Sequence, residues 1–247
     1  MANPRELPLN LLQFYLTAPY PCSYLEEKEA RSQVLSPNSP LNSPIYSELV
    51  RHGFRRSGGF TYRPYCDTCQ ACVPVRVDVN HFEWRRINRR VYKKNQDLTI
   101  HHHKLIFKEE HYQLYLAYQK ARHPKKDNEL DNKEQYIHFL IHSPVDSELI
   151  EFRLNQQLVM VSVVDYLDDG LSSVYTFFDP ELDSRSLGQF NILWQINQCQ
   201  RLNLPWLYLG YWIRECRKMN YKIQFQPLQG LLNKEWQPLQ FSLQEND

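Results

Sequence analysis

This 247-residue sequence has few glycines, no long apolar run and little net charge, and these features exclude several classes of protein. Only 7 glycines, set against 13% aromatic residues, argue against a disordered chain. No apolar run approaches the length of a membrane span, and no basic segment leads into an apolar block at the start, so we expect neither a membrane anchor nor a secretory leader. A net charge of +1 offers no global field for a polyanion, so any nucleic-acid contact must come from a local patch. Together with six cysteines, these features predict a folded, soluble protein of the reducing cytoplasm.

Three of the cysteines form a cluster, Cys66, Cys69 and Cys72, and Cys22 lies far upstream. Thiolate ligands for zinc or an iron–sulfur cluster often have a spacing of three residues, but a zinc ribbon needs two separate pairs of this kind. Here there is one overlapping pair and one remote cysteine. A metal site at these four residues and a packed cluster of reduced thiols therefore both remain open.

Arg63 and Arg76 flank the cysteine cluster. In the segment Val73-Pro74-Val75-Arg76-Val77, strand alternation places the valines on one face and Arg76 on the other. A guanidinium fixed in an apolar strand suits the planar shape of a carboxylate. The alternative is that both arginines pair with structural acids.

A strongly basic helix is predicted from residue 84 to residue 95. Residues 84–94 contain six cations and no acid, and Arg86, Arg89, Arg90, Lys93 and Lys94 fall on one stripe. Ile87, Val91 and Trp84 are expected on the other side. Because like charges at this spacing repel each other, the stripe favours a contact with phosphates, for which a solvated face is the alternative.

The order of predicted elements indicates an α+β protein. After a helix at 45–53, strands surround the cysteine loop at 60–79. Helices at 109–122 and 133–142 precede strands at 149–154, 158–166 and 171–179. A helix from Ser186 to residue 202, a strand at 204–211, a short helix to 219 and a strand near 222–225 follow. From residue 105 this is the order of the GNAT acetyltransferase fold, so we divide the chain into a cysteine-containing lobe with the basic helix at 1–98 and a GNAT-like acyltransferase lobe at 99–247.

The turn before the helix at Ser186 lies where a GNAT enzyme would bind coenzyme A, so its residues indicate whether coenzyme A is the acyl donor. A GNAT enzyme binds the pyrophosphate with the motif R/Q-x-x-G-x-G/A at a helix start. Arg185 to Gly188 fit its first four positions, but Phe190 replaces the final small residue. Its side chain would block the pyrophosphate, so we expect the scaffold to be kept and the acyl donor changed. A plain strand-to-helix turn is the alternative.

The sequence resembles the bacterial aspartate/glutamate leucyltransferases, relatives of the eukaryotic arginyl-tRNA–protein transferases. The matching strings lie between about residues 14 and 236: Pro21 to Leu25, Gly53 to Gly58, Tyr62 to Pro64 with the three clustered cysteines, Val73 to Val77, Arg89-Arg90, Ser173 to Pro180, Ser186 to Gly188, Tyr208 to Trp212 and Lys218 to Lys222. The match is weakest between 100 and 150. Eukaryotic relatives carry further paired cysteines that bind metal or an iron–sulfur cluster, whereas Leu25 stands where the partner of Cys22 would be.

The resemblance implies transfer of leucine from leucyl-tRNA to proteins that begin with Asp or Glu, in an N-degron pathway, by an enzyme with two GNAT-like lobes. This reaction requires no cofactor beyond the co-substrate leucyl-tRNA. On this basis we expect Arg76 and Arg63 to bind the acidic side chain of the acceptor. The tRNA phosphates are expected to contact Arg86, Arg89, Arg90 and Lys93. The catalytic residues are Asp179 and Tyr175, and the aminoacyl groove comprises Ser186, Gly188, Tyr208 and Tyr211.

Three other functions remain as alternatives. Arginyl transfer differs only in the donor amino acid. An acetyl-CoA-dependent N-acetyltransferase is disfavoured by Phe190 and the basic helix, and a zinc-dependent RNA-binding module by the acyltransferase-like second unit.

Overall fold

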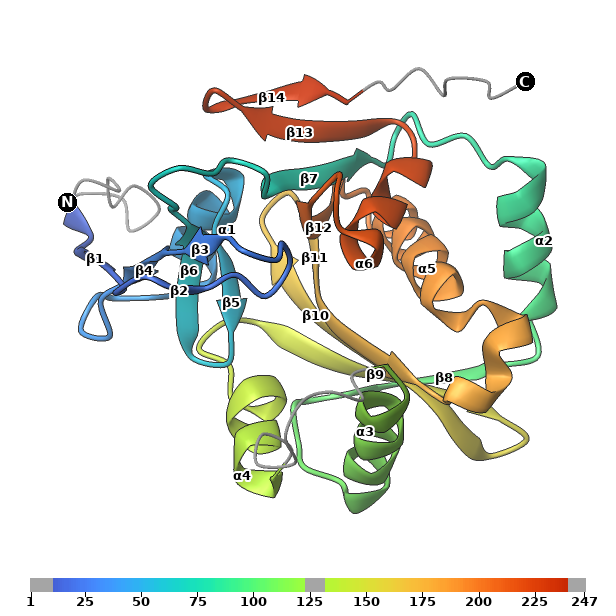
Figure 1. The fold of residues 1–247 in the computed structure, drawn as a ribbon. Coiled ribbons are helices and arrows are strands. Elements are labelled where there is room, and N and C mark those ends of the chain that lie inside the picture. The colour runs from blue at the N-terminus through green and yellow to red at the C-terminus, as the bar shows by residue number, and fades with distance from the viewer. Residues whose placement is uncertain (1–10, 123–131, 240–247) are drawn as a thin grey trace, which may run out of the picture.

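A sheet of eight strands forms the centre of the protein in the computed structural model, which describes residues 11–122 and 132–239. Figure 1 shows the arrangement of its strands and helices. The strand order is β14-β13-β7-β12-β11-β10-β9-β8. In chain order the strands are β7 (Val73–Asp78), β8 (Thr99–His103), β9 (Ser147–Leu154), β10 (Gln157–Leu167), β11 (Gly170–Phe178), β12 (Trp206–Trp212), β13 (Leu228–Leu232) and β14 (Glu235–Pro238).

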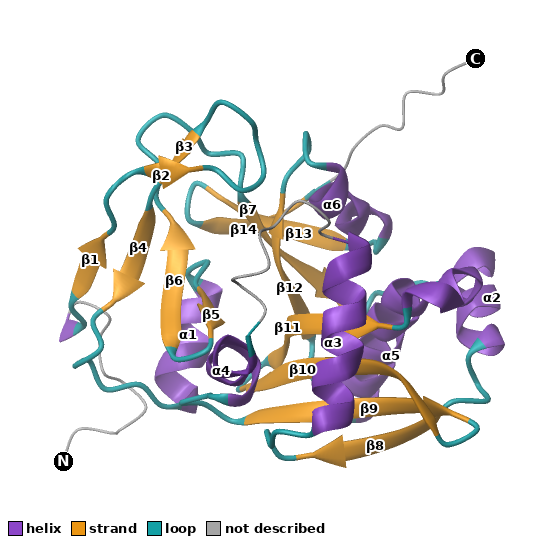
Figure 2. Ribbon diagram, turned by 60° about the horizontal axis from the view of Figure 1, so that its bottom comes forward, coloured by secondary structure: helices purple, strands orange, loops and turns teal. Residues whose placement is uncertain are grey.

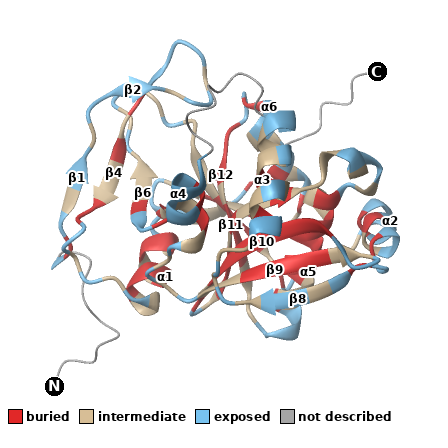
Figure 3. Cartoon of the chain, turned by 90° about the horizontal axis from the view of Figure 1, so that it is seen from below, coloured by how far each residue is buried: buried red, intermediate tan, exposed pale blue. Residues whose placement is uncertain are grey.

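Helices cover both faces of this sheet (Figure 2). On one face α5 (Leu187–Arg201) packs with α2 (Arg86–Lys94), and their core includes Val77, Val91, Leu193 and Leu207. The other face carries α3 (Glu109–Arg122), α4 (Lys133–Tyr136) and a π-helical turn, η3 (Ile137–Ile141). The central strands are buried between these layers, while much of α2 is exposed (Figure 3).

A smaller sheet lies beside the large one. It has the order β1-β4-β6-β5, with β1 (Phe14–Leu16), β4 (Ser32–Leu35), β5 (Arg55–Ser57) and β6 (Phe60–Pro64). A ribbon of β2 (Tyr20–Pro21) and β3 (Glu29–Ala30) adjoins it. Helix α1 (Ser43–Arg51) joins the two sheets, because its Leu49 packs on the small sheet and its Tyr46 and Val50 pack against Leu167 and Tyr208 of the large one.

The strands β11 and β12 form the one parallel pair among the described strands. They are paired only from Gly170 to Ser172 and from Trp206 to Tyr208, although both strands continue beyond these residues. Gly210 adopts a positive φ of 71°, next to a register shift in the pairing of β12 with β7. The two parallel strands therefore separate along their C-terminal halves.

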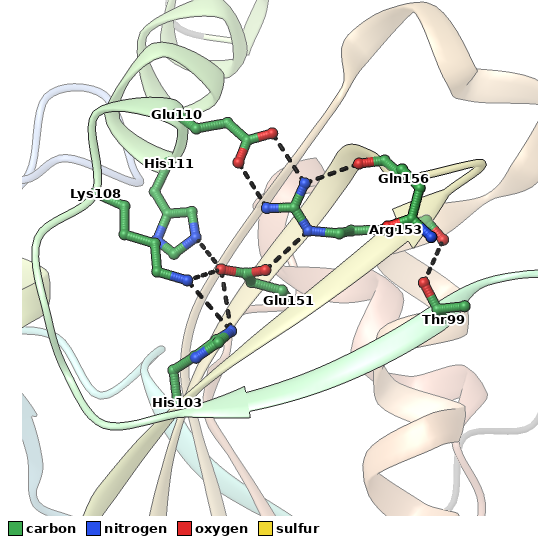
Figure 4. A network of polar contacts seen from close by, with 8 residues as sticks. All are labelled: Thr99, His103, Lys108, Glu110, His111, Glu151, Arg153 and Gln156. Atoms are coloured by element: carbon green, nitrogen blue, oxygen red, sulfur yellow. Dashed lines mark hydrogen bonds and ion pairs between the residues drawn. The ribbon is translucent and has the colours of Figure 1, made fainter.

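Helix α3 is anchored by a network of charges centred on the buried carboxylate of Glu151 on β9 (Figure 4). His111 of α3 and Lys108 contact one carboxylate oxygen of Glu151, and Arg153 contacts the other at 2.9 Å. Arg153 also forms two hydrogen bonds to Glu110, of 3.0 and 2.6 Å. These contacts fix the helix against β8 and β9.

Most predicted elements are present, with several corrections. The helix predicted at 133–142 ends as a π-helical turn, and the strand predicted at 222–225 is a 3₁₀ turn, η5 (Tyr221–Gln224), after α6 (Arg217–Asn220). The final strands come later, as the hairpin of β13 and β14, whose two-residue turn Asn233-Lys234 has positive φ angles. Of the apolar residues predicted opposite the cationic stripe, Val91 is buried, whereas Ile87 is 60% exposed.

A mixed α/β architecture is confirmed, but two GNAT-like lobes are not. Within the described residues the smaller sheet contains only antiparallel pairs. The division at residue 98 stays a prediction; β7, from the predicted first lobe, pairs with β12 and β13 of the second. Among residues 11–122 and 132–239, no helix combines the length and the apolar character needed to cross a bilayer.

Candidate functional site

A pocket of about 690 Å³ opens between the β2–β3 ribbon, the cysteine loop and the end of β12. Its aromatic lining consists of five tyrosines, Tyr20, Tyr24, Tyr62, Tyr65 and Tyr211. The hydroxyl of Tyr211 donates a hydrogen bond to the carbonyl of Gly53, which fixes this ring against the N-terminal part of the chain. The predicted groove residue Tyr211 therefore lines this pocket.

The four cysteines of the predicted metal site, Cys22, Cys66, Cys69 and Cys72, all line the same pocket. All are free thiols, and burial, with smaller contributions from the neighbouring thiols, raises the pKa of Cys72 to about 12. In the described part of the chain, no three His, Cys, Asp or Glu side chains are arranged to hold a metal ion. The sequence brings the thiols to one place, but their arrangement does not fit zinc or an iron–sulfur cluster.

Arg76 does not face the pocket. Its guanidinium is enclosed between the rings of Trp206 and Trp236, at 3.5 and 4.4 Å from their centroids. Nε and Nη2 donate to Oε1 of Gln229 at 3.0 and 2.9 Å, and Nη1 donates to the hydroxyl of Tyr208 at 3.3 Å. Arg76 is thus held by Gln229, Tyr208 and two tryptophan rings and is 9% exposed, and its assignment to the acceptor carboxylate stays a prediction.

Arg63 is also engaged elsewhere. Its Nε donates to Gln33 at 2.8 Å, its Nη1 donates to the carbonyl of His52 at 3.1 Å, and its guanidinium lies over the ring of Phe54. The alternative prediction, that both arginines pair with structural acids, is wrong within the described residues. The partners of Arg76 and Arg63 are amides, a hydroxyl, a carbonyl and aromatic rings.

A different arginine lies at the gap between the separating strands. Arg55 of β5 donates from Nη2 to the carbonyl of Val174 on β11 at 3.0 Å. On β12, a Cβ atom at Gly210 would lie 2.9 Å from Nη1 of Arg55, so the absence of a side chain there makes room for the guanidinium. Tyr62, Tyr211 and Tyr24 are close enough to interact with Arg55 electrostatically. Arg55 therefore sits behind the tyrosine lining of the pocket.

Lys222 of η5 lies beside the same part of β12 as Arg55. Its Nζ donates to the carbonyl of Tyr211 and contacts the sulfur of Met219 at 3.8 Å. The side chain is buried, and burial, followed by the charge of Arg55, lowers the pKa of Lys222 to about 7. Arg55 and Lys222 both belong to strings that carry the family resemblance, but the sequence patterns predicted no role for either.

The predicted catalytic pair lies apart from the pocket. Asp179 caps the 3₁₀ helix η4 (Pro180–Arg185) by accepting a hydrogen bond from the backbone N–H of Glu181 at 2.9 Å. The ring of Tyr175 packs against Phe139 on the α3 face of the sheet, with a centroid distance of 5.0 Å. In the described structure neither residue lines the 690 Å³ pocket, and their catalytic role stays a prediction.

The other predicted groove residues have structural positions. Ser186 precedes α5 in a left-handed conformation, and within the described chain its side chain makes no capping hydrogen bond. A Cβ atom at Gly188 would lie 3.2 Å from the ring of Phe178, which accounts for the glycine by close packing. Tyr208 is buried and donates to Asp169 at 3.0 Å.

The segment that resembles a coenzyme A motif is filled by protein. Phe190 is buried against Tyr92 and Phe152. Arg185 forms a two-point ion pair with Asp97, at 2.9 and 2.8 Å, and donates to the carbonyl of Lys94 at the end of α2. This turn is therefore packed against α2 rather than open to a pyrophosphate.

Helix α2 presents the predicted cations to solvent. Arg86, Arg89, Arg90 and Lys93 are all exposed, and Val91 and Asn88 form its buried side. The helix is held from beneath by the edge-to-face contact of Trp84 with Tyr92 and by the packing of Tyr92 on Phe190. The stripe is thus free to meet a polyanion.

Comparison with known proteins identifies the family. The family model described as "Arginine-tRNA-protein transferase, N terminus" matches residues 20–90, and that described as "Arginine-tRNA-protein transferase, C terminus" matches residues 110–232. The aspartate/glutamate leucyltransferase of Nitrosospira multiformis is 53% identical over 97% of this chain and 96% of its own length, and that of Thiobacillus denitrificans is 54% identical over 96% and 99%. The crystal structure of FemX is similar at 9% identity, with a TM-score of 0.42 over 82% of this chain and 80% of that one. The chain belongs to the aspartate/glutamate leucyltransferase family of aminoacyl-tRNA–protein transferases.

Proposed function

We propose that this protein transfers leucine from leucyl-tRNA to the N-terminal residue of proteins that begin with Asp or Glu. The relatives named for this reaction match almost the whole chain. The observation that carries the proposal is the tyrosine-lined pocket beside the gap between β11 and β12, with Arg55 placed in that gap. A carboxylate-bearing acceptor suits a site of this character, because a partly buried guanidinium binds a planar carboxylate well.

The reaction is the aminolysis of an ester. The α-amine of the acceptor attacks the carbonyl carbon of the leucyl ester, a C–N bond forms, and the C–O bond to the tRNA ribose breaks. The leaving ribose oxygen takes up the proton that the amine loses. An α-amine has a pKa of about 7.7–8.0, so an appreciable neutral fraction exists near pH 7. Because the ester is already activated, correct positioning alone can contribute about 7–11 kcal/mol.

The donor tRNA is assigned to the basic stripe of α2. Its four exposed cations follow one side of a helix that is fixed to α5 by aromatic packing. Phosphate contacts of this kind supply affinity and orientation without reading a base sequence. The blocked coenzyme A position at Phe190 favours an aminoacyl-tRNA donor over acetyl-CoA.

The scaffold we infer is of the GNAT type for the large sheet. An antiparallel run of β9, β10 and β11, a crossover through α5, and a parallel strand β12 that separates from β11 provide the opening in which such folds hold an acyl donor. Because leucyl-tRNA is a cytoplasmic substrate, we place the protein in the cytoplasm, where the product would enter an N-degron pathway.

A transfer assay with a panel of charged tRNAs and matched peptides tests this function. Leucyl-tRNA with a peptide that begins with Asp or Glu should give product, and arginyl-tRNA should give little. Efficient transfer of arginine would instead support the arginyl alternative, and absence of transfer from any charged tRNA would contradict the proposed reaction.

A further inference from the structure

Two positively charged side chains meet beside the pocket without a negative partner. The hydrogen bonds of Arg55 and Lys222 go to the carbonyls of Val174 and Tyr211 and to the sulfur of Met219. Across the described residues, no carboxylate lies within ion-pair distance of either group. Bringing two cations together in a poorly solvated place is costly, so the arrangement favours a role for an external anion.

Arg56, the next residue in the chain, is a structural arginine and differs from Arg55 in having an acidic partner. Arg56 follows Arg55 on β5 and points to the other side of the strand. There it forms a two-point ion pair with Asp165, and both side chains are fully buried. The fold thus supplies a carboxylate for Arg56, while the described structure supplies none for Arg55.

The backbone holds the two cations close to each other. The guanidinium of Arg55 lies against Gly210, and the ammonium of Lys222 is bound to the carbonyl of the next residue, Tyr211. The ring of Tyr211 lines the pocket, and so does Tyr24, which also interacts with Arg55. Neither cation is among the residues that line the pocket. Both lie beside the backbone of Gly210 and Tyr211, so a carboxylate in the pocket would reach them only past the ring of Tyr211.

We propose that Arg55 and Lys222 bind the side-chain carboxylate of the acceptor's first residue and so set the preference for Asp and Glu. This inference rests on the proposed function and names the residues that would confer its specificity. Three further arginines near the cysteine loop have other partners: Arg31 lines the pocket but pairs with Asp67 at 3.2 Å, and Arg76 and Arg63 have donors directed to Gln229, Tyr208, Gln33 and His52. An amide at the first residue would leave the two cations unpaired, which explains why shape-matched Asn and Gln should be rejected.

The test compares two peptides that differ only in Asp or Asn at the first residue. For Arg55→Met and Lys222→Met, we expect kcat/KM for the Asp peptide to fall about 100-fold, with little change for the Asn peptide. The ratio between the two peptides should therefore approach one, while the KM for leucyl-tRNA stays the same. Lys120→Met removes a charge from an exposed residue of α3, outside the lining of the pocket, and should keep the ratio.

Direct binding provides a readout without transfer. Calorimetry of the full-length protein with the Asp peptide alone should show binding to the wild type and to Lys120→Met, and no binding to Arg55→Met or Lys222→Met. If a methionine variant fails to fold, Arg55→Lys and Lys222→Arg, which keep the charge, should preserve the preference for Asp over Asn.

Two results would overturn the inference. One is an unchanged Asp-to-Asn ratio in folded Arg55→Met and Lys222→Met. The other is a defect confined to the KM for leucyl-tRNA, which would assign the two cations to a tRNA phosphate. Both results require an active wild-type enzyme, so they are distinct from a failure of the proposed function itself.

Discussion

Arg56 and Asp165 form a two-point ion pair, with distances of 2.8 and 2.6 Å, that joins β5 of the small sheet to β10 of the large one. Both side chains are fully buried, and Ser147 donates a further hydrogen bond to the same carboxylate at 2.6 Å. The pair therefore fixes the strand that carries Arg55 against the sheet that carries the separating strands.

Breaking this pair should destabilise the whole protein. Arg56→Met leaves the carboxylate of Asp165 buried without its cation, which typically costs about 3–5 kcal/mol. Denaturant unfolding followed by fluorescence measures the change. The double variant Arg56→Met with Asp165→Leu should recover part of this stability, because no isolated charge remains. A single variant within about 1 kcal/mol of the wild type would show that the pair is not structural.

Sequence patterns predicted the regular elements well. Helix α3 has the predicted bounds, and the three-strand run before α5 is correct to within a few residues, because burial of one helix stripe or strand face dictates the periodicity. The strands β13 and β14 were not predicted, because the alternating pattern from Lys222 to Phe225 is typical of a strand and predicts the last strand at that position. The Asn233-Lys234 pair, which forms their turn with positive φ angles, was a sequence feature that could have predicted this hairpin.

The site was harder to predict because it depends on contacts between distant segments. Strand alternation correctly placed Arg76 opposite the valines, but it gave no sign that Trp206 and Trp236 would enclose it. Arg55 and Arg56 look equivalent in sequence, and only the fold gives one of them an acid. The exposed stripe of α2 was predictable because it follows from local periodicity alone.

Gly210→Ala should impair the site without removing any functional group. A Cβ atom would lie 2.9 Å from Nη1 of Arg55, and the backbone φ of 71° is strained for alanine. The guanidinium must then shift, so we expect a fall of about 10-fold or more in kcat/KM for the Asp peptide and a decrease of about 1–2 kcal/mol in stability. Gly59→Ala provides a control, because Gly59 is exposed and its nearest contact is the flexible ring of His142 at 3.2 Å. Wild-type kinetics in Gly210→Ala would contradict the close approach.

The Glu151 network should make stability sensitive to acid. Burial alone would raise the pKa of Glu151, but hydrogen bonds from Lys108, His111 and Arg153 outweigh it and lower the pKa to about 2. Since an unfolded glutamate titrates near 4.3, this contribution is complete above about pH 5 and is lost as the pH falls toward 2. Glu151→Gln should cost about 3–5 kcal/mol at pH 7. The difference from wild type should shrink at pH 3 in denaturant unfolding, and a difference independent of pH would contradict the assignment.

Lys222→Met should stabilise the protein while it damages specificity. The lowered pKa means that between about pH 7 and 10 the unfolded chain holds more protons on this group than the folded one. Wild-type stability therefore gains from this group as the pH rises through that window, and the full penalty applies at pH 7 and below. We expect the variant to be more stable by about 1–2 kcal/mol at pH 6 and to show a smaller advantage at pH 9. A variant less stable than the wild type at pH 6 would show that the ammonium has a counter-charge in the folded protein.

The basic stripe of α2 should account for much of the salt dependence of tRNA binding. Arg89→Glu with Arg90→Glu removes two exposed cations from the stripe, so fewer counterions are released and the slope of log Kd against log salt should fall by about 1 for each tRNA phosphate that is no longer neutralised. Binding of the Asp peptide should not change, because α2 lies on the α5 side of the sheet, away from the lining of the pocket. Lys120→Glu with Lys133→Glu makes the same change in net charge on exposed residues of α3 and α4, on the opposite face, and should leave the slope almost unaltered. Equal changes in slope for the two double variants would mean that the tRNA responds to the overall charge of the protein. An unchanged slope in Arg89→Glu with Arg90→Glu would show that the stripe is only a solvated face.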